Sequence, residues 1–374
     1  MAGSTRLVDL VQSRLDGFLA EQSAALAQIS PDLEVIDRSA RQLLAGGKRF
    51  RALFCYWGWR SITALADDSW AGDDLGEAGQ AVDPIVSVAA ALEIFHAAAL
   101  VHDDIMDNSD LRRGRPSLHR SFEALHGEQG WTGSGRQYGD ASALLTGDLL
   151  LAWSDELFEA GAALAGNPDA AAAARAQFSL MRTEVTVGQY LDMLEETSWR
   201  TRPETELLSR AHRVIVYKSA KYSVEAPLTI GASLAEASLA QLAALRSFGL
   251  PLGVAFQLRD DLLGVFGDPT VTGKPAGDDL REGKRTVLVT LARQKLPASA
   301  ARLFDELLGD DSLDEQQIGM LQTAVRDSGA VEQVERIIAH NVGVATAALA
   351  DAPLARSARD ELSALAEAAT KRES

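Results

Sequence analysis

Three acidic residues close the apolar segment PIVSVAAALEIFHAAALVHDDIMD, at positions Asp103, Asp104 and Asp107. In a helix, Asp103 and Asp107 are four residues apart, so their carboxylates project from one face about one turn from each other. Like charges at this spacing repel, and the helix dipole disfavours anions at a C-terminal end. Bound cations relieve that cost, and hard carboxylate oxygens favour Mg²⁺, with Mn²⁺ as the alternative. For a lone motif, the competing interpretation is a solvated acidic helix end.

A second acidic pair, Asp260 and Asp261, follows another long apolar segment. Two such pairs, each expected to end an apolar helix, would face each other across a helical bundle and hold several divalent ions. Hydrated Mg²⁺ completes its coordination with phosphate oxygens of a substrate. The paired motifs therefore predict a diphosphate substrate.

Clusters of basic residues are informative in a chain whose formal net charge is −17. The stretch GGKRFR, residues 46–51, places two glycines and three cations at an expected helix start, and RRGR follows at 112–115. Lys218 lies in an expected helix, and Lys274 and Lys284 flank a charged loop. Arginine binds phosphate oxygens through two donors and lysine acts as a point charge, while glycines expose backbone N–H groups to anions. Each cluster alone would be a solvated patch, but together with the acidic pairs they predict phosphate binding.

The bulk composition excludes several classes of protein. The acidic surface argues against a nucleic-acid or anionic-membrane partner. The single cysteine, Cys55, cannot form an internal disulfide, which fits a reducing cytoplasm. The N-terminal segment carries acidic residues within its apolar periodicity, so we expect no signal peptide, and no long charge-free run predicts a membrane span.

The elements that would position these residues are helices. The sequence is rich in Ala, Leu and Glu with 6% aromatic residues, and it lacks alternating β-branched runs. Proline marks helix starts at Ser30-Pro31, Asp83-Pro84, Asn167-Pro168 and Arg202-Pro203. We expect one all-α domain over residues 1–374, a helical bundle with a central active-site cavity. Its helices should span 5–28, 31–45, 49–66, 84–107, 139–165, 168–196, 203–230 and 235–266, with shorter helices over 284–370.

Three loops rich in glycine or aspartate separate these helices, at 67–82, 126–139 and 267–283. The acidic pairs in the first loop have no basic partners nearby, and we interpret them as solvated. Histidines at 96 and 102 are six residues apart, which does not fit a zinc pair on a helix. We expect His102 either to support a metal ligand without binding the metal itself or to be structural.

The ordered set GGKRFR, HDDIMDNSDLRRGRPSLH, GQYLDM, YKSAKY and FQLRDDLLGVFGDPTVTGKPAGDDLREGKRT resembles the trans-isoprenyl diphosphate synthases, the polyprenyl synthetase family. The resemblance covers about residues 30–290, and the whole order is much more specific than any single motif. It implies a bundle of the isoprenoid synthase type, a homodimer, and Mg²⁺-dependent condensation of isopentenyl diphosphate with an allylic diphosphate.

The resemblance also implies a role for each matching residue. Those expected to hold isopentenyl diphosphate are Lys48, Arg51, His96 and Arg113, and Arg112 is expected to hold the allylic diphosphate. The acidic residues of the first motif are Asp103, Asp104 and Asp107, with Asp103 and Asp107 as direct Mg²⁺ ligands. The remaining matches are Gln189, Asp192, Lys218, Ser219, Gln257, Asp260, Asp261, Lys274 and Lys284, with Asp260 as a metal ligand and the last two closing over the leaving diphosphate.

Two positions depart from the family pattern. Ser219 replaces the commoner threonine but keeps the hydroxyl group, and Gly264 stands at the fifth position of the second motif, where the family often has aspartate. Asp268 lies nearby in the loop. We expect metal binding to survive, because the first aspartate of the motif is the expected direct ligand.

Product length should depend on the side chains before the first acidic motif. Ala98 and Ala99, one turn before Asp103, are small and leave room beyond a C15 product. Phe95, another turn away together with Ile94, is large enough to form a floor. We therefore predict a C20 product, geranylgeranyl diphosphate, with longer polyprenyl chains as the alternative.

Two other readings compete. A class I terpene cyclase shares the helical fold and one acidic motif, but it would lack the second Asp-Asp pair and the GGKRFR stretch. A non-catalytic subunit of a heteromeric synthase would carry a damaged acidic motif, and only Gly264 points that way.

Overall fold

The computed structural model describes residues 2–65, 79–268, 276–310 and 312–370. Within these ranges the chain is helical almost throughout, and strand pairing is confined to β1 (Leu111–Arg112) and β2 (Arg115–Pro116). The all-α prediction is therefore confirmed. The chain divides into two compact units, with boundaries that fall inside helices α7, α10 and α17. Unit 1 comprises Met1–Phe178, Pro227–Leu242 and Pro353–Leu362, and unit 2 comprises Ser179–Ala226, Ala243–Ala352 and Ser363–Ser374.

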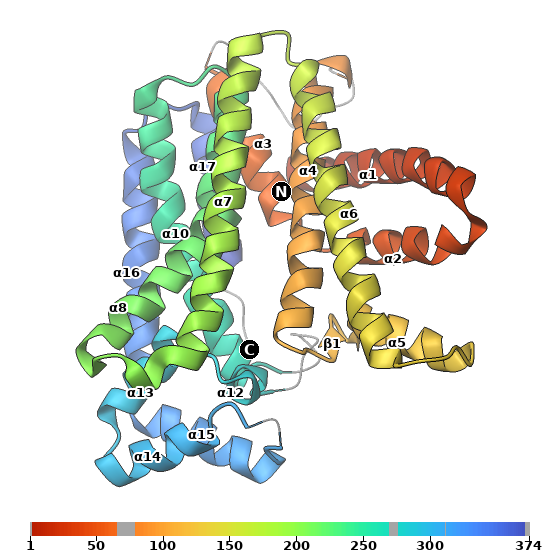
Figure 1. Cartoon of the computed structure of the whole chain (residues 1–374). Helices are drawn as coiled ribbons and strands as arrows, with labels where there is room; N and C mark the ends of the chain where they lie inside the picture. The colour runs from red at the N-terminus through yellow and green to blue at the C-terminus, as the bar shows by residue number, and fades with distance from the viewer. Residues whose placement is uncertain (1, 66–78, 269–275, 311, 371–374) are drawn as a thin grey trace. The chain divides into compact units, whose positions relative to one another are not determined.

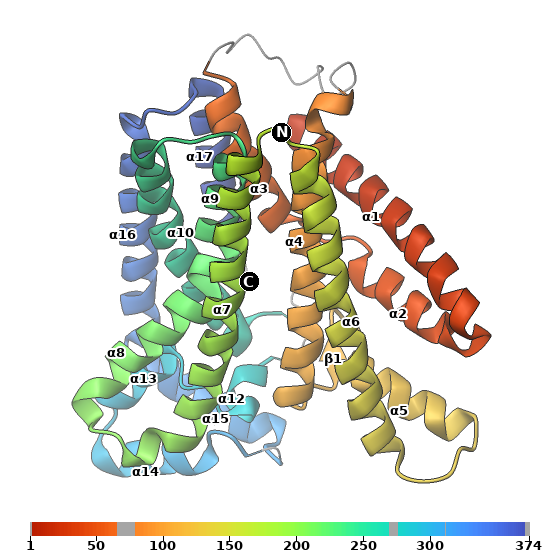
Figure 2. The ribbon, with the colours of Figure 1, turned by 45° about the horizontal axis from the view of Figure 1, so that its top comes forward.

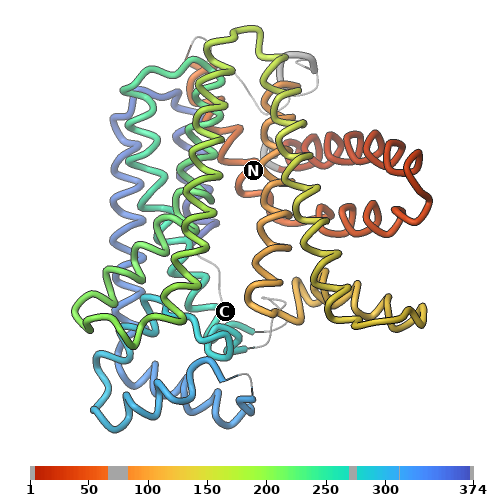
Figure 3. The backbone as a smooth tube through the Cα atoms, in the orientation of Figure 1, coloured from red at the N-terminus to blue at the C-terminus, as the bar shows by residue number. Residues whose placement is uncertain are grey.

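Unit 1 is built around the pair α4 and α6, which run side by side (Figures 1 and 3). Glycines allow this close packing, because a Cβ on Gly147 would overlap the His102 ring and one on Gly161 would lie 2.8 Å from the Ser87 Cβ. Figure 2 shows α1 and α2 as a neighbouring antiparallel pair. The elements are α1 (Ala2–Ile29), η1 (Pro31–Leu33), α2 (Glu34–Leu44), α3 (Phe50–Thr63), α4 (Gly79–Met106), α5 (Leu118–Glu128), α6 (Gly135–Ala163), the first part of α7 (Pro168–Ser198), and α9 (Ala226–Leu234).

Unit 2 has an apolar core that includes Leu280, Leu288, Phe304 and Val334. Its helix α13 packs against α8, α15 and α16. The elements are the second part of α7, η3 (Trp199–Thr201), α8 (Glu204–Val214), the π-helix η4 (Ile215–Glu225), most of α10 (Leu239–Phe266), α12 (Asp278–Glu282), α13 (Val287–Lys295), α14 (Ala298–Leu307), α15 (Glu315–Asp327), α16 (Ala330–Ala350) and the second part of α17 (Arg356–Thr370).

Most of the expected helix starts are confirmed. The Ser30 hydroxyl accepts from the Asp32 N–H at 3.2 Å, and the Asn167 side chain accepts from the Asp169 N–H at 3.0 Å. The expected start at Asp83-Pro84 is wrong, because α4 begins at Gly79 and contains Pro84. A proline this close to a helix start removes one hydrogen bond, and the buried residues that follow stabilise the helix regardless.

Other differences lie beside the acidic motifs. Helix α5 and the β1–β2 hairpin were not predicted, and the segment expected as one helix over 203–230 is α8, a π-helix and α9. The second acidic pair does not end its helix, since α10 continues to Phe266. Lys274 and most of the 67–82 loop lie outside the described residues. The single-domain prediction and the central cavity remain predictions.

Two described helices are long and apolar enough to span a membrane by length and composition, namely Asp83–Met106 and the whole of α10. Their apolar windows are 78% and 44% buried within the protein, respectively. Core helices of soluble proteins pass the same test, so this observation is weak evidence for a membrane span.

Candidate active site

The glycine-rich stretch before α3 forms a turn, and this turn positions the Lys and Arg side chains of GGKRFR at the start of the helix. Gly46 and Gly47 have φ of 67° and 95°, a region that favours glycine, and Arg49 follows at 51°. Arg49 is buried and pairs with Glu93 of α4, with 3.1 Å between Nη1 and Oε2. The other Glu93 oxygen accepts from the Ala52 N–H at 3.2 Å. Arg49 therefore anchors the start of α3 to α4, and it has a structural role that sequence analysis did not assign.

The RRGR stretch forms the β1–β2 hairpin. Its two turn residues, Arg113 and Gly114, have φ of 52° and 72°, as a tight two-residue hairpin turn requires. An arginine in this region costs about 1–2 kcal/mol, and such strain is often found at functional sites. A Cβ on Gly47 would lie 3.6 Å from Nη2 of Arg113, so the guanidinium lies against the glycine turn. The two basic motifs thus meet within unit 1.

These cations surround His96 on α4. The pKa of His96 is lowered well below its usual value by burial first, and then by repulsion from Arg51, Arg113, Arg112 and Arg49. Burial also lowers the pKa of Arg113, and neighbouring Arg49 adds to this effect. We call Arg51, Arg112, Arg113 and His96 the arginine cluster. A bound anion would relieve the repulsion between the guanidinium groups of this cluster. Lys48, close to Arg51 in the sequence, is exposed.

The first acidic motif has the predicted one-turn spacing. The Asp107 N–H donates to the Asp103 carbonyl at 2.8 Å, so the helical turn continues past the end of α4. Asp104 is 2% exposed and accepts from the Arg112 guanidinium, with Nε at 2.9 Å. Nη2 of Arg112 is also 3.6 Å from Asp103. Arg112 therefore neutralises Asp104, whereas the Asp103 and Asp107 carboxylates remain partly exposed.

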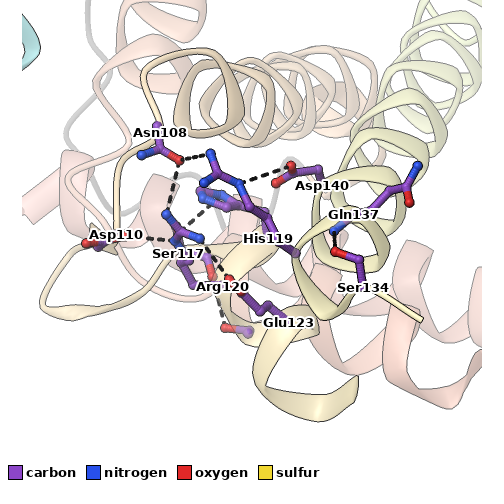
Figure 4. A network of polar contacts seen from close by, with 11 residues as sticks. Asn108, Asp110, Ser117, His119, Arg120, Glu123, Ser134, Gln137 and Asp140 are labelled. Carbon is purple, nitrogen blue, oxygen red and sulfur yellow. Dashed lines mark hydrogen bonds and ion pairs between the residues drawn. The ribbon is translucent and has the colours of Figure 1, made fainter. Parts of the chain in front are cut away.

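A polar network fixes the turn that follows this motif (Figure 4). Arg120 of α5 donates to Asn108 at 3.0 Å, to Asp110 at 2.7 Å and to Glu123 at 2.8 Å. Arg136 of α6 donates to Asn108 at 3.2 Å. Asn108 has φ of 51°, so its backbone conformation is held by side chains of two helices. No local sequence pattern predicts this network, because its contacts depend on α5.

His102 faces away from this motif and lies against α6. Its Nε2 is 3.3 Å from the Leu144 carbonyl and 3.5 Å from Asp148, which agrees with the structural role expected of it.

The remaining site residues lie in unit 2, where the π-helix presents Lys218 and Ser219. Lys218 pairs with Asp192 of α7 at 2.5 Å. A Cβ on Gly188 would overlap the backbone at Lys218, and one on Gly253 would overlap the Ala220 carbonyl. The two glycines thus let α7 and α10 approach the π-helix backbone, and π-helical turns are frequent at functional sites. The neighbouring residue Gln189 is half-buried on α7.

A chain of hydrogen bonds connects the π-helix to the second acidic pair. The Ser219 hydroxyl donates to Gln257 Oε1, and Gln257 Nε2 donates to Asp261 Oδ1 at 2.8 Å. Asp261 is 3% exposed, and its pKa is raised well above the usual value by burial first and then by Asp279. Asp260 is partly exposed beside it. Lys284 pairs with Glu282 at 2.6 Å and is 3.9 Å from Asp279.

The donor chemistry fits Mg²⁺. In the described ranges, no three acidic, histidine or cysteine side chains are arranged to hold a metal by themselves. Mg²⁺ is usually held by one or two carboxylates together with waters and phosphate oxygens, so a self-sufficient cage is not required. The buried Asp261 Oδ2 has no hydrogen-bond partner among the described residues, as expected of an oxygen that faces a cation or its waters.

The expected chain-length residues lie on α4. Ala98 is buried and Ala99 is half-buried. The Phe95 ring makes an edge contact with Phe178, with centroids 6.1 Å apart, and Phe178 stacks on Phe158 at 4.4 Å. Phe95 is therefore backed by two further buried rings of unit 1, which makes it a rigid side chain.

Comparisons with known proteins identify the family of this chain. A sequence model of the polyprenyl synthetase family matches residues 33–325. A short chain isoprenyl diphosphate synthase of Methanocaldococcus jannaschii is 31% identical over 78% of this chain and 76% of its own length. A geranylfarnesyl diphosphate synthase of Aeropyrum pernix is 31% identical over 82% of this chain and 84% of its own length.

The structure of a geranylgeranyl pyrophosphate synthase from Corynebacterium glutamicum, complexed with isoprenyl diphosphate and magnesium, is also similar. It has a TM-score of 0.89 and 36% identity, and the match covers 98% of this chain and 99% of that one. On the extent of these matches, the chain belongs to the polyprenyl synthetase family, the trans-isoprenyl diphosphate synthases.

Proposed function

We propose that this protein is a Mg²⁺-dependent prenyltransferase that condenses isopentenyl diphosphate with an allylic diphosphate to give geranylgeranyl diphosphate. The observation that carries the proposal is the arginine cluster around His96, which lies in the same unit as the Asp103–Asp107 turn. A partly exposed group of neighbouring cations favours a multiply charged anion, and an acidic turn favours a divalent cation. One unit therefore offers sites for a diphosphate and for its metal.

Each group of residues has a distinct part in the proposed reaction. Isopentenyl diphosphate is held by Lys48, Arg51, His96 and Arg113, and the allylic diphosphate by Arg112, through charge-assisted hydrogen bonds. Asp103 and Asp107 of unit 1, and Asp260 of unit 2, are the proposed metal ligands of their own units, and bound Mg²⁺ would neutralise charge developing on the leaving diphosphate. Lys218, Lys274 and Lys284 add positive charge to that diphosphate. The allylic C–O bond breaks, the double bond of isopentenyl diphosphate attacks the allylic carbon, and a proton is lost to the released diphosphate.

The proposed product length rests on Phe95. Small side chains at Ala98 and Ala99 leave space for a growing chain, and the next turn presents an aromatic ring held by Phe178. The magnesium complex reported above is of a geranylgeranyl synthase, whereas the relative from Aeropyrum pernix makes a C25 product by its name. A longer product is therefore the alternative, and it requires the Phe95 ring to leave its contact with Phe178.

The deciding experiment is product analysis after incubation with labelled isopentenyl diphosphate, Mg²⁺ and each of the C5, C10 and C15 allylic diphosphates. We expect a linear C20 diphosphate that disappears when EDTA is added. Products of C25 or longer would show that the proposed product length is wrong and that the proposed condensation reaction is right. A lack of incorporation with every starter would reject the synthase proposal and favour a cyclase or a non-catalytic subunit.

We further propose a cytoplasmic homodimer without a stable membrane span. The exposed side chains Leu144 and Leu145 give α6 an apolar surface that a second copy could cover. Sedimentation of the purified protein should give twice the chain mass of 39.9 kDa. A monomer at all concentrations would contradict the dimer.

A further inference from the structure

Helix α4 ends in a turn that redirects the chain directly after the first acidic motif. The Ser109 N–H donates to the Asp104 carbonyl at 3.0 Å, and the Asn108 N–H donates to the Ile105 carbonyl at 3.3 Å. This pair of hydrogen bonds is the Schellman motif, in which the residue in the left-handed region is usually glycine. Here that residue is Asn108, with φ of 51°, and it directly follows Asp107. The conformation of Asn108 therefore sets how the chain leaves the acidic motif.

The Asn108 side chain accepts hydrogen bonds from two arginines of different helices. Its Oδ1 accepts from Nη2 of Arg120 at 3.0 Å, as Figure 4 shows, and from Nη2 of Arg136 at 3.2 Å. Arg120 belongs to α5, and Arg136 belongs to the first turn of α6. The Arg120 side chain is 22% exposed and that of Arg136 is 62% exposed. We therefore expect Arg120 to make the stronger contact, because water screens exposed charges.

Helices α5 and α6 hold each other in place. A Cβ on Gly139 of α6 would overlap the His119 carbonyl of α5, so the two backbones are in close contact. The ring of Tyr138 on α6 also makes an edge contact with Phe122 of α5, with centroids 6.3 Å apart. The two arginines therefore reach Asn108 from helices that are fixed relative to one another.

The chain is held on both sides of Asn108. Before it, the Asp107 N–H donates to the Asp103 carbonyl at 2.8 Å, which keeps these two residues in one helical turn. After it, the Asp110 carboxylate accepts from Nε of Arg120 at 2.7 Å. A change in the position of Asn108 is therefore transmitted to the acidic residue that precedes it.

The alternative is that Asn108 only tolerates the left-handed conformation that the turn requires, which asparagine adopts more readily than most residues. The end of α9, also in unit 1, argues against it. There the Ala237 N–H donates to the Ala232 carbonyl at 3.1 Å, and Glu236 takes the left-handed position with φ of 62°. Glu236 is exposed, and its side chain makes no hydrogen bond or ion pair with the described residues. The same turn thus forms without such contacts, and the arginines at Asn108 need another explanation.

We propose that Asn108 is a positioning residue, which accepts hydrogen bonds from Arg120 and Arg136 and thereby holds Asp103 and Asp107 in the arrangement that binds metal. The helices α5 and α6 would in this way support the first acidic motif. The proposal rests on the proposed function, in which Asp103 and Asp107 are the metal ligands.

Replacing Asn108 by glycine separates the backbone conformation from the side-chain contacts, because glycine suits the left-handed region but has no acceptor. Amide hydrogen exchange of residues 103–112, measured by mass spectrometry on the metal-free full chain, should be at least about tenfold faster in Asn108→Gly, as expected from losing a charged hydrogen bond. Glu236→Gly is the matched control, since it makes the same change in the same turn without removing a contact. Exchange of residues 230–240 in this control should equal that of the wild type, and circular dichroism verifies that both variants are folded.

The consequence for the metal is measured by titrating the full chain with Mn²⁺ in the presence of inorganic diphosphate and recording free Mn²⁺ by electron paramagnetic resonance. Asn108→Gly should weaken Mn²⁺ binding about tenfold, the size typical of losing a group that supports a metal ligand. Glu236→Gly should bind Mn²⁺ as the wild type does. Arg120→Gln should also weaken binding, and combining it with Asn108→Gly should cost less than the product of the two single losses, because both remove the same contact.

Unchanged exchange in Asn108→Gly, equal changes in the two glycine variants, or wild-type Mn²⁺ affinity in Asn108→Gly would each overturn the proposal. Single losses that multiply in the double variant would show that Arg120 does not act through Asn108. The exchange measurement does not depend on turnover or on metal. If it gives the expected difference but the wild type neither binds Mn²⁺ nor forms product, the proposed function is rejected, and Asn108 holds the turn without positioning a metal.

Discussion

The arginine cluster of unit 1 and the acidic group of unit 2 are opposites in charge but alike in construction. In the first, burial, followed by repulsion from three arginines of the cluster and from Arg49, lowers the pKa of His96. In the second, burial of Asp261, followed by repulsion from Asp279 and Asp260, raises the pKa of its carboxyl group. Each group places like charges where burial makes repulsion costly, and neither arrangement would favour folding by itself.

The comparison shows that a ligand can be inferred where the fold holds like charges close together, because such an arrangement costs free energy unless an opposite charge binds. A buried group of cations indicates an anion, and a buried group of carboxylates indicates a cation. The Asp104–Arg112 pair is the contrasting case, because its charges compensate within the protein. We therefore expect Asp104 to support the turn, and Asp103 to contact the metal.

The largest expected effect comes from removing a metal ligand in the first motif. Asp103→Ala should lower kcat/KM by at least about a hundredfold, since loss of one electrostatic contact to a reacting group costs that much. The exposed Asp9→Ala on α1 loses the same charge and should leave the rate unchanged. Steady-state kinetics at saturating Mg²⁺ measures the effect, and equal rates in both variants would show that the Asp103 turn does not bind metal.

Replacing an arginine of the cluster tests whether this part of unit 1 binds a diphosphate. Arg113→Ala should raise KM for isopentenyl diphosphate about ten- to hundredfold, corresponding to loss of a charged hydrogen bond. Arg115, on the same hairpin but outside the arginine cluster, provides the matched control as Arg115→Ala. The KM for the allylic diphosphate should change little in either variant. A rise in the allylic KM alone would reassign Arg113 to the other substrate.

An intermediate effect is expected from the uncharged aromatic rings of unit 1. Phe95→Ala should shift the product distribution toward chains longer than C20, and it should destabilise the fold by about 3–5 kcal/mol through loss of a buried ring. Phe178→Leu removes the edge contact with Phe95 and should give a smaller shift. Phe122→Ala on α5, which also removes a buried ring, should leave product lengths unchanged. An unchanged distribution in Phe95→Ala would show that the product floor lies elsewhere.

Local patterns in the sequence were enough for the helices and for the first acidic turn. The four-residue spacing of Asp103 and Asp107 and the helix-start residues Ser30 and Asn167 act within one or two turns, so the sequence alone predicts their geometry. The ordered motifs also indicated the family, which the matches confirm.

Contacts between distant segments could not be predicted in this way. The Arg112–Asp104 pair, the Arg120 network and the approach of Asp279 to Gly264 all join residues on separate elements. The π-helix also depends on tertiary packing, since Gly188 and Gly253 let two helices approach its backbone. These glycines were the available signal, because an isolated glycine within a helical pattern often marks close packing.

The smallest expected effect is a pH dependence of stability produced by burial of His96 beside the arginines. In the unfolded chain His96 binds a proton near its ordinary pKa of about 6.5, whereas in the folded protein burial and four arginines keep it neutral well below that value. The unfolded state therefore binds more protons as the pH falls, so the free energy of unfolding decreases below pH ~6.5, by up to about 1.4 kcal/mol per pH unit. His96→Gln should lose less stability than the wild type between about pH 7 and 5, while exposed His340→Gln should follow the wild type. Denaturant unfolding across this range measures the difference, and parallel curves for the wild type and His96→Gln would show that the arginines do not act on His96 as a cluster.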